Sequence, residues 1–293
     1  MISALRGAGL AFIDARDLAE ALDVLGKYGA DATVLAGGTD VIVQYLRGDI
    51  RPNLLLHVRN VPELKGLSVA NPTVIGAATT HWQIVANTRM RHAHAALAEA
   101  ADTVGGRQTQ NVGTIAGNVV NASPAADLLP ALLIGDATVT LASGSTTREI
   151  PLADFVVGRR STLREPDELV VKLSLERLGV RTGETYLKVG RRGAMEVAIV
   201  GLAARVAFDE DGTVVDARIA VCSVAPKAFR VKDTERRLLG SRLDQETLRE
   251  AGELLRRAAK PIDDARADAA YRTRVLAPLL ERAARVCRER AGF

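Results

Sequence analysis

The sequence predicts an α+β protein with about two domains, on the strength of three observations. Its 293 residues exceed the roughly 150 typical of one domain. The first fifty residues alternate between helix-like and strand-like patterns, whereas the second half groups its strands before its helices. An apolar fraction of 47% and a charged fraction of 25% are both near the globular average, which excludes a disordered chain.

The N-terminal part is predicted to be one α/β unit. Asp17 is a suitable N-cap for a helix whose apolar residues Leu18, Leu22 and Leu25 share one face, and Gly29 ends that helix. A strand, a second helix and a further buried strand follow. The expected elements are a helix over 18–28, a strand over 32–35, a helix over 40–46 and a strand over 52–58.

From Asn60 the pattern changes to short strands and turns. Strands are expected over 67–70, 74–77 and 137–142, and a helix of small residues near 93–104 interrupts them. His92 and His94, at the start of that helix, are two positions apart and so fall on different helix faces. We therefore expect both to be surface residues and not a metal-binding pair.

The second half has a distinct order. Strands are expected over 170–175, 184–189, 198–208 and 214–221, with Asp211-Gly212 marking a hairpin between the last two. Helices are expected over 245–259 and 265–290, and Pro278 should kink or split the second of them. The boundary between the two halves is expected near 177–183.

Charge and cysteine content exclude several classes of protein. A net charge of +4 is too small to indicate a nucleic-acid-binding protein. Cys222 and Cys287 are too few for a four-cysteine zinc or iron–sulfur site, so two reduced thiols in a cytoplasmic protein are expected. No apolar run is long enough to span a bilayer. Basic side chains outnumber acidic ones from Arg230 onward, which favours a solvated basic face over a surface for an acidic partner.

Two glycine-bearing segments stand out, of which the first is VLAGGTDVI (34–42). A predicted strand delivers Gly37 and Gly38 directly before a helix start. Glycines allow a ligand to approach the backbone closely, and free N–H groups at a helix start suit a phosphate. A simple strand-to-helix turn capped by Thr39 or Asp40 is the alternative.

The second segment is QNVGTIAGNVVNASPAADLLP (110–130). Because it is dense in Gly, Asn, Ser and Thr, we expect it to be irregular, with many backbone N–H groups able to surround a pyrophosphate. Asp127 could accept a hydrogen bond from a ribose hydroxyl. The alternative is a long structural loop before a helix capped at Ser123 or Asp127.

Several catalytic motifs are absent. The sequence contains no G-x-G-x-x-G, P-loop or G-x-S-x-G motif, and no acid–base or nucleophile constellation. A Rossmann or Walker phosphate site is therefore excluded, and no catalytic residue is assigned.

The two glycine segments resemble those of a known family. AGGTD (36–40) and NVGTIAGNVVNASPAADLLPAL (111–132) are similar to the FAD-binding medium subunits of molybdenum hydroxylases of the carbon monoxide dehydrogenase and xanthine dehydrogenase type. The resemblance continues through DELVVKLSL (167–175), YLKVGRR (186–192) and IDDARADAAYRTRVLAPLLERA (262–283). Thr39-Asp40 stand where many relatives carry His-Ser, and Ala116 where many carry Gly.

The resemblance implies a fold and a domain organisation. It implies an FAD-binding domain of the vanillyl-alcohol-oxidase/PCMH type over 1–178, with a small α/β subdomain at about 1–58 and an antiparallel-sheet α+β subdomain at 59–178. A C-terminal domain with a small antiparallel sheet and helices is implied over 179–293.

It also implies electron transfer between partners. In this family a molybdenum subunit oxidises the substrate, electrons pass through two [2Fe–2S] clusters on a small subunit to FAD on the medium subunit, and the flavin reduces NAD, oxygen or a quinone. A dimer of heterotrimers is implied. The alternatives are a flavin-free scaffold or assembly protein of the same fold and a stand-alone flavin oxidoreductase. The intact glycines argue against the first, and the lack of a substrate base in the recognised segments argues against the second.

Matching motif positions imply the FAD-binding residues. The segments 36–40 and 114–118 would cradle the pyrophosphate from two sides. Asn121 and Asp127 would bind the ribityl-phosphate or ribose region. Val170 would lie against the isoalloxazine ring, and Lys188 near its polar edge. The full implied set is Leu35, Ala36, Gly37, Gly38, Thr39, Asp40, Thr114, Ile115, Ala116, Gly117, Asn118, Asn121, Asp127, Val170 and Lys188, with no metal ligand.

Overall fold

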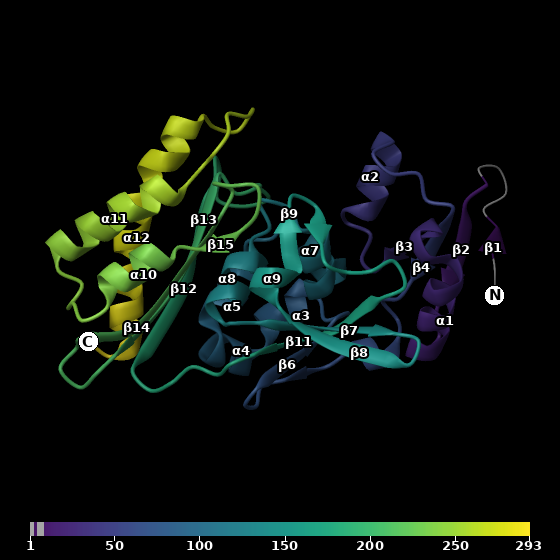
Figure 1. The fold of residues 1–293 in the computed structure, drawn as a ribbon, viewed down its shortest axis with the longest axis horizontal. Helices are drawn as coiled ribbons and strands as arrows, with labels where there is room; N and C mark the ends of the chain where they lie inside the picture. The colour runs from purple at the N-terminus through teal and green to yellow at the C-terminus, as the bar shows by residue number, and fades with distance from the viewer. Residues whose placement is uncertain (1–2, 5–8) are drawn as a thin grey trace.

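The computed structural model describes residues 3–4 and 9–293, which form three sheet-centred units in chain order (Figure 1). Helix α1 of the first unit and helix α12 of the last lie at opposite ends of an elongated molecule. Across the described residues, none of the helices combines the length and the apolar content needed to span a bilayer.

The N-terminal unit is a sheet in the order β1-β2-β4-β3, in which β2, β4 and β3 run parallel. Asp17 caps α1 as predicted, because its carboxylate accepts the N–H of Glu20 at 2.8 Å. Side chains alternate across the strands, so α1 packs on one face of the sheet and α2 on the other. The elements are β1 (Ser3–Ala4), β2 (Ala11–Asp14), α1 (Leu18–Tyr28), η1 (Gly29–Asp31), β3 (Ala32–Leu35), α2 (Val41–Arg47) and β4 (Leu54–His57).

The middle unit is an antiparallel sheet in the order β5-β6-β11-β7-β8, accompanied by short helices. Its strands are β5 (Leu67–Ser68), β6 (Thr73–Gly76), β7 (Thr138–Ser143), β8 (Thr146–Pro151) and β11 (Leu169–Leu175), with a separate pair β9 (Val156–Gly158) and β10 (Ser161–Thr162). Its helices are η2 (Pro62–Leu64), α3 (His81–Ala86), α4 (Thr88–Ala93), α5 (Ala95–Asp102), α6 (Arg107–Val112), α7 (Ile115–Asn121), α8 (Leu128–Ile134) and α9 (Leu152–Phe155).

The prediction of an irregular segment over 110–130 is wrong. The segment contains the end of α6, all of α7 and the start of α8. Its composition disfavours helix, but tertiary bonds stabilise the first turn of α7, where Ile115 N–H donates to Thr79 O at 2.9 Å and Ala116 N–H donates to Ala77 O at 3.3 Å.

The prediction that His94 is a surface residue is also wrong, whereas His92 is exposed as predicted. His94 is 1% exposed, and its Nε2 lies 2.9 Å from the Thr73 hydroxyl. The predicted helix over 93–104 is therefore interrupted at His94, which separates α4 from α5.

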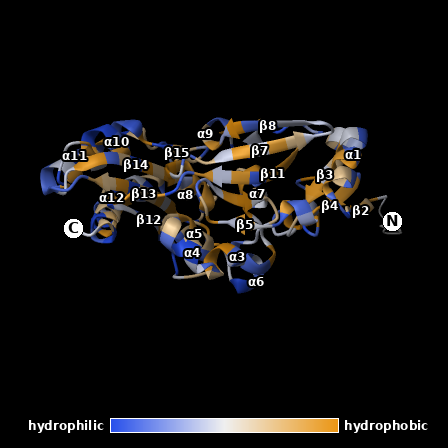
Figure 2. Ribbon diagram, turned by 90° about the horizontal axis from the view of Figure 1, so that it is seen from below, coloured by the Kyte–Doolittle hydropathy of each residue, from blue (hydrophilic) through white to orange (hydrophobic). Residues whose placement is uncertain are grey.

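The C-terminal unit is an antiparallel sheet in the order β12-β13-β14-β15, with α10 and α12 against one face and α5 and α8 of the middle unit against the other, and α11 packs on α10 and α12. Figure 2 shows its strands as largely hydrophobic and the outer surfaces of α10 and α11 as hydrophilic. Its elements are β12 (Thr182–Val189), β13 (Val200–Phe208), β14 (Val214–Cys222), β15 (Phe229–Arg230), α10 (Lys232–Leu238), α11 (Gln245–Ala258) and α12 (Ala269–Ala291).

Helix α12 runs through Pro278 without a break, so of the predicted kink or split the split does not occur. Proline lacks the N–H that would bond to the carbonyl four residues earlier, which is that of Arg274. The Arg256 guanidinium of α11 donates to this carbonyl at 3.3 Å. A neighbouring helix therefore satisfies the group that proline leaves unpaired.

Buried polar contacts join the C-terminal sheet to the middle unit. The Glu184 carboxylate of β12 accepts the N–H of Ala96 at the start of α5 and pairs with Arg205 at 2.7 Å. The Glu99 carboxylate of α5 accepts the N–H of Tyr186 at 2.8 Å. Regular structure is absent between the end of β11 at Leu175 and the start of β12 at Thr182. The domain bounds 1–178 and 179–293 stay a prediction.

Candidate functional site

The first glycine segment forms a loop with a row of free hydrogen-bond donors. Gly38 has a φ of 71°, a conformation that suits glycine. Within the part of the chain that the structure describes, the backbone N–H groups of residues 37–41 have no hydrogen-bond partner, and α2 bonding starts with Ile42 N–H donating to Gly38 O. Consecutive N–H groups without partners form a binding site for an anion.

The two glycine segments touch each other at Gly37. A Cβ atom on Gly37 would lie 1.9 Å from the carbonyl oxygen of Val112 and 2.9 Å from the nitrogen of Gly113. Only a residue without a side chain allows the loop after β3 to approach the junction of α6 and α7 so closely. Glycine at this position therefore sets the spacing between the two sides of the site.

The second segment contributes in a different way from the one expected. Its early N–H groups are already used, because Ile115 and Ala116 bond to the middle unit and Gly117 N–H donates to the Thr114 hydroxyl at 3.1 Å. Thr114 is thus the N-cap of α7. This segment supplies shape and short side chains, and the first segment supplies the free backbone donors.

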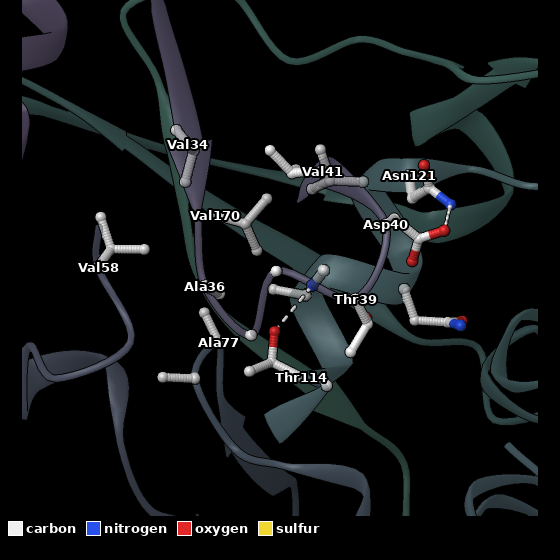
Figure 3. A pocket seen from close by; sticks show the side chains of 18 of the residues that line it. Val34, Ala36, Thr39, Asp40, Val41, Val58, Ala77, Thr114, Asn121 and Val170 are labelled. Atoms are coloured by element: carbon white, nitrogen blue, oxygen red, sulfur yellow. Dashed lines mark hydrogen bonds between the residues drawn. The ribbon is translucent and has the colours of Figure 1, made fainter. Parts of the chain in front are cut away.

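A cavity of about 650 Å³ opens between these segments. Figure 3 shows the apolar side chains of Val34, Val58, Ala77 and Val170 on one side and the polar Asp40 and Asn121 on the other. The structure brings eleven of the predicted site residues to its lining: Ala36, Gly37, Gly38, Thr39, Asp40, Thr114, Ala116, Gly117, Asn118, Asn121 and Val170.

Four predicted residues lie outside this lining. Leu35 and Ile115 are buried in hydrophobic clusters. Asp127 and Lys188 form an ion pair at 2.9 Å, with side chains 9% and 10% exposed. Lys188 Nζ also donates to the carbonyl of Thr103 at 3.0 Å, next to Val104, which lines the cavity. The pair is therefore next to the lining in the chain contacts it makes, but it is not part of the lining.

Each oxygen of the Asp127 carboxylate has a protein partner. One oxygen accepts the Tyr186 hydroxyl at 2.6 Å and the other accepts Lys188. Burial raises the pKa of Asp127, while the Lys188 ammonium and the Tyr186 hydroxyl oppose that rise. Asp127 stands at the N-cap position of α8 but makes no capping bond to that helix.

Sequence reasoning missed several residues that line the cavity. Gln44, Ala78, His81, Val104 and Arg164 all face it. The segment GAATTH (76–81) directly after β6 was a signal for some of them, because small residues after a strand let other backbone segments approach. Gln44 and Arg164 carry no local signal, since only the tertiary fold brings them here.

Two buried polar atoms of the lining have no partner among the described residues. They are Nδ1 of His81 and Oδ1 of Asn118. Burial lowers the pKa of His81 to about 4, so its imidazole is neutral near pH 7. A buried polar atom without a partner is destabilising unless a ligand or water satisfies it. Both residues line the cavity, but these two atoms are themselves buried and not exposed to it.

The fold and the site together indicate a protein that binds a cofactor. Free N–H donors beside a largely apolar cavity suit a cofactor that has both an anionic part and a large apolar part. Such cavities at the junction of two subdomains are typical cofactor sites.

Comparison with known proteins identifies the family. Residues 8–175 match the FAD binding domain in molybdopterin dehydrogenase, and residues 185–286 match the CO dehydrogenase flavoprotein C-terminal domain. The chain therefore belongs to the family of FAD-binding medium subunits of molybdenum hydroxylases, as its motifs predict, and it is an oxidoreductase subunit that binds FAD.

Individual relatives align over nearly their whole length. The carbon monoxide dehydrogenase medium chain of Hydrogenophaga pseudoflava is 32% identical over 92% of this chain and 93% of that protein. Subunit alpha of the 6-hydroxypseudooxynicotine dehydrogenase complex of Paenarthrobacter nicotinovorans is 30% identical over 92% of each chain. The solved carbon monoxide dehydrogenase of Hydrogenophaga pseudoflava superposes with a TM-score of 0.91, at 29% identity over 95% of this chain and 97% of that one. The predicted α+β architecture is confirmed.

Proposed function

We propose that this chain carries FAD in the cavity between its glycine segments and transfers electrons between partner subunits and an external acceptor. The observation that carries the proposal is the row of N–H groups at residues 37–41 that have no partner among the described residues and belong to residues that line the cavity, as an anionic pyrophosphate would need. The absence of a side chain at Gly37, which lets the two segments approach closely, fits the same cofactor.

Each part of the cavity has a role in this proposal. The 37–41 loop binds the pyrophosphate, and α7 closes the opposite side with Thr114 and Gly117. Val170 and Ala77 provide an apolar surface for the ring system. When bound, FAD supplies the redox chemistry, and the protein supplies position and electrostatics.

Lys188 has an indirect role in this proposal. Its ammonium is held by the Asp127 carboxylate and by the carbonyl of Thr103, which precedes the lining residue Val104. Because its charge is largely offset by the paired Asp127 carboxylate, its role in this proposal is to fix the backbone beside the cavity through Thr103. Direct contact of Asp127 or Lys188 with the cofactor stays a prediction.

The electrons would come from other polypeptides. A [2Fe–2S] cluster is typically held by four cysteines, and this sequence has two, both buried. We therefore propose that a small subunit carries the [2Fe–2S] clusters, a large subunit carries the molybdenum cofactor, and the holoenzyme is a dimer of heterotrimers. The acceptor is NAD, oxygen or a quinone, and the location is cytoplasmic.

The visible absorption spectrum tests this function. The chain expressed alone and then mixed with FAD should show protein-bound flavin without iron–sulfur bands, and it should not oxidise small organic donors by itself. Turnover by the isolated chain would instead indicate a stand-alone flavin oxidoreductase. A complex purified from the native source that contains this chain but no flavin would indicate a scaffold protein.

A further inference from the structure

Helix α2 is held weakly on the outside of the cofactor cavity. None of its residues is buried, and it contacts the N-terminal sheet through Val41 and Tyr45. Ile42, Val43 and Leu46 are exposed, Leu46 by 77%. In Figure 1, α2 projects away from the sheet on the side that faces α7. Because so little apolar area fixes α2, its polar contacts matter for its position.

Three side chains connect α2 and its N-cap residue to α7 at one side of the cavity. Asn121 Nδ2 donates to Asp40 Oδ1 at 3.0 Å, the bond drawn in Figure 3. Gln44 Nε2 donates to Asn121 Oδ1 at 3.1 Å. All three residues line the cavity, and the amide of Asn121 has a partner on each of its polar atoms. We call this chain of hydrogen bonds, Gln44–Asn121–Asp40, the latch.

Asp40 would ordinarily have a different partner. It stands at the N-cap position of α2, where an aspartate usually accepts an N–H from its own helix. Its side chain makes no such bond here and instead accepts from Asn121, 81 residues further along the chain. The local capping bond is thus replaced by a bond between two residues of the cavity lining.

The other end of the latch is firmly placed. Asn121 is the last residue of α7, and the next carbonyl, that of Ala122, accepts the N–H of Arg160 at 2.9 Å. Val119 and Ile115 of α7 are fully buried. The latch therefore joins a weakly held helix to a well-packed one.

We infer that Gln44 and Asn121 are positioning residues that hold α2 against α7 and thereby set how fast FAD leaves the cavity. The inference rests on the proposed FAD site. It assigns to Gln44 a role that its sequence position does not suggest, because Gln44 acts through Asn121 and Asp40 and not on the cofactor. The free N–H groups of residues 37–41 belong to the same loop, so an α2 that moves outward also moves these donors.

The first test replaces Gln44 by methionine, which keeps the length of the side chain and removes its donor. Loss of one partly buried hydrogen bond should make FAD dissociate about fivefold faster. Val43→Thr on the exposed side of the same helix is the matched control and should stay within about twofold of wild type. Dissociation is measured by dilution of the FAD-loaded protein and recovery of flavin fluorescence.

The second test exchanges the donor and acceptor residues of the hydrogen bond between Asn121 and Asp40. Asn121→Asp alone places two carboxylates at the 3.0 Å contact, so FAD should dissociate faster than from Gln44→Met. Adding Asp40→Asn restores a donor opposite an acceptor and the original net charge, and dissociation should return to within about threefold of wild type. If the double variant released FAD as fast as Asn121→Asp, the inference would be wrong, because these side chains would then act on FAD directly.

A third measurement separates the latch from the proposed function. Without FAD, backbone amide hydrogen exchange over 41–47 should be faster in Gln44→Met than in wild type and in Val43→Thr. A wild-type chain that binds no FAD would refute the proposed site but would leave this comparison intact. A wild-type chain that binds FAD, with Gln44→Met releasing it no faster than Val43→Thr, would refute the latch alone.

Discussion

Replacement of Gly37 by alanine is the sharpest single perturbation of the site. The added Cβ would lie 1.9 Å from the carbonyl oxygen of Val112 and 2.4 Å from its carbon. Separations under 3.0 Å do not persist between such atoms, so the loop and the α6–α7 junction must move apart by about 1 Å. Overpacking of this kind costs about 1–3 kcal/mol, which corresponds to about 5- to 150-fold in an equilibrium constant.

The displacement falls between the two sides of the proposed FAD site. We therefore expect Gly37→Ala to weaken FAD binding by about 5- to 150-fold, measured by titration of FAD against the apoprotein with fluorescence detection. Gly26→Ala is the matched control, because Gly26 lies in α1 and a Cβ there meets no atom within 4 Å. That control should gain about 0.5–1 kcal/mol of stability, measured by urea unfolding, with unchanged FAD affinity. Normal FAD binding by a folded Gly37→Ala protein would refute the assignment of this loop.

Two further predictions concern buried charge. Lys188→Met removes the partner of Asp127 in a pair that is about nine-tenths buried, so the free energy of unfolding measured in urea should fall by about 3–5 kcal/mol. Adding Asp127→Asn should recover part of this loss. Equal stability of Lys188→Met and wild type would show that the pair is not stabilising. Burial lowers the pKa of His94 to about 4, below the unfolded value of 6.5. The unfolded state therefore binds more protons, so stability present above pH 6.5 falls as the pH drops from 6.5 toward 4, by about 3 kcal/mol for this residue. His94→Gln should make this dependence shallower in unfolding curves recorded across that range, and an unchanged dependence would exclude His94 as its source.

Local signals predicted most of the fold. Asp17 caps α1 and Gly29 ends it, and the strands that begin at Ala32 and Val214 start where the apolar runs start. These features depend on neighbours within a few residues, which the sequence displays directly. The glycine segments were located in the same way, and eleven of the fifteen residues predicted to bind the cofactor line one cavity.

Three departures from local rules share one physical cause, which is a tertiary partner that replaces a local one. Asp40 and Asp127 stand at N-cap positions, but their carboxylates bond to Asn121 and to Lys188 from distant parts of the chain. Pro278 does not split α12 because Arg256 satisfies the carbonyl that proline leaves free. In each case the local rule holds for the isolated segment, and a side chain from elsewhere changes the outcome.

The most direct test of the account is amide hydrogen exchange of the wild-type chain with and without saturating FAD. The free N–H groups of residues 37–41 should exchange rapidly in the apoprotein and slow markedly when FAD binds, because a pyrophosphate would accept their hydrogen bonds. Peptides from the outer faces of α10 and α11 should be unaffected. Tight FAD binding with unchanged exchange over 37–41 would contradict the account, since the cofactor would then be held by another part of the protein.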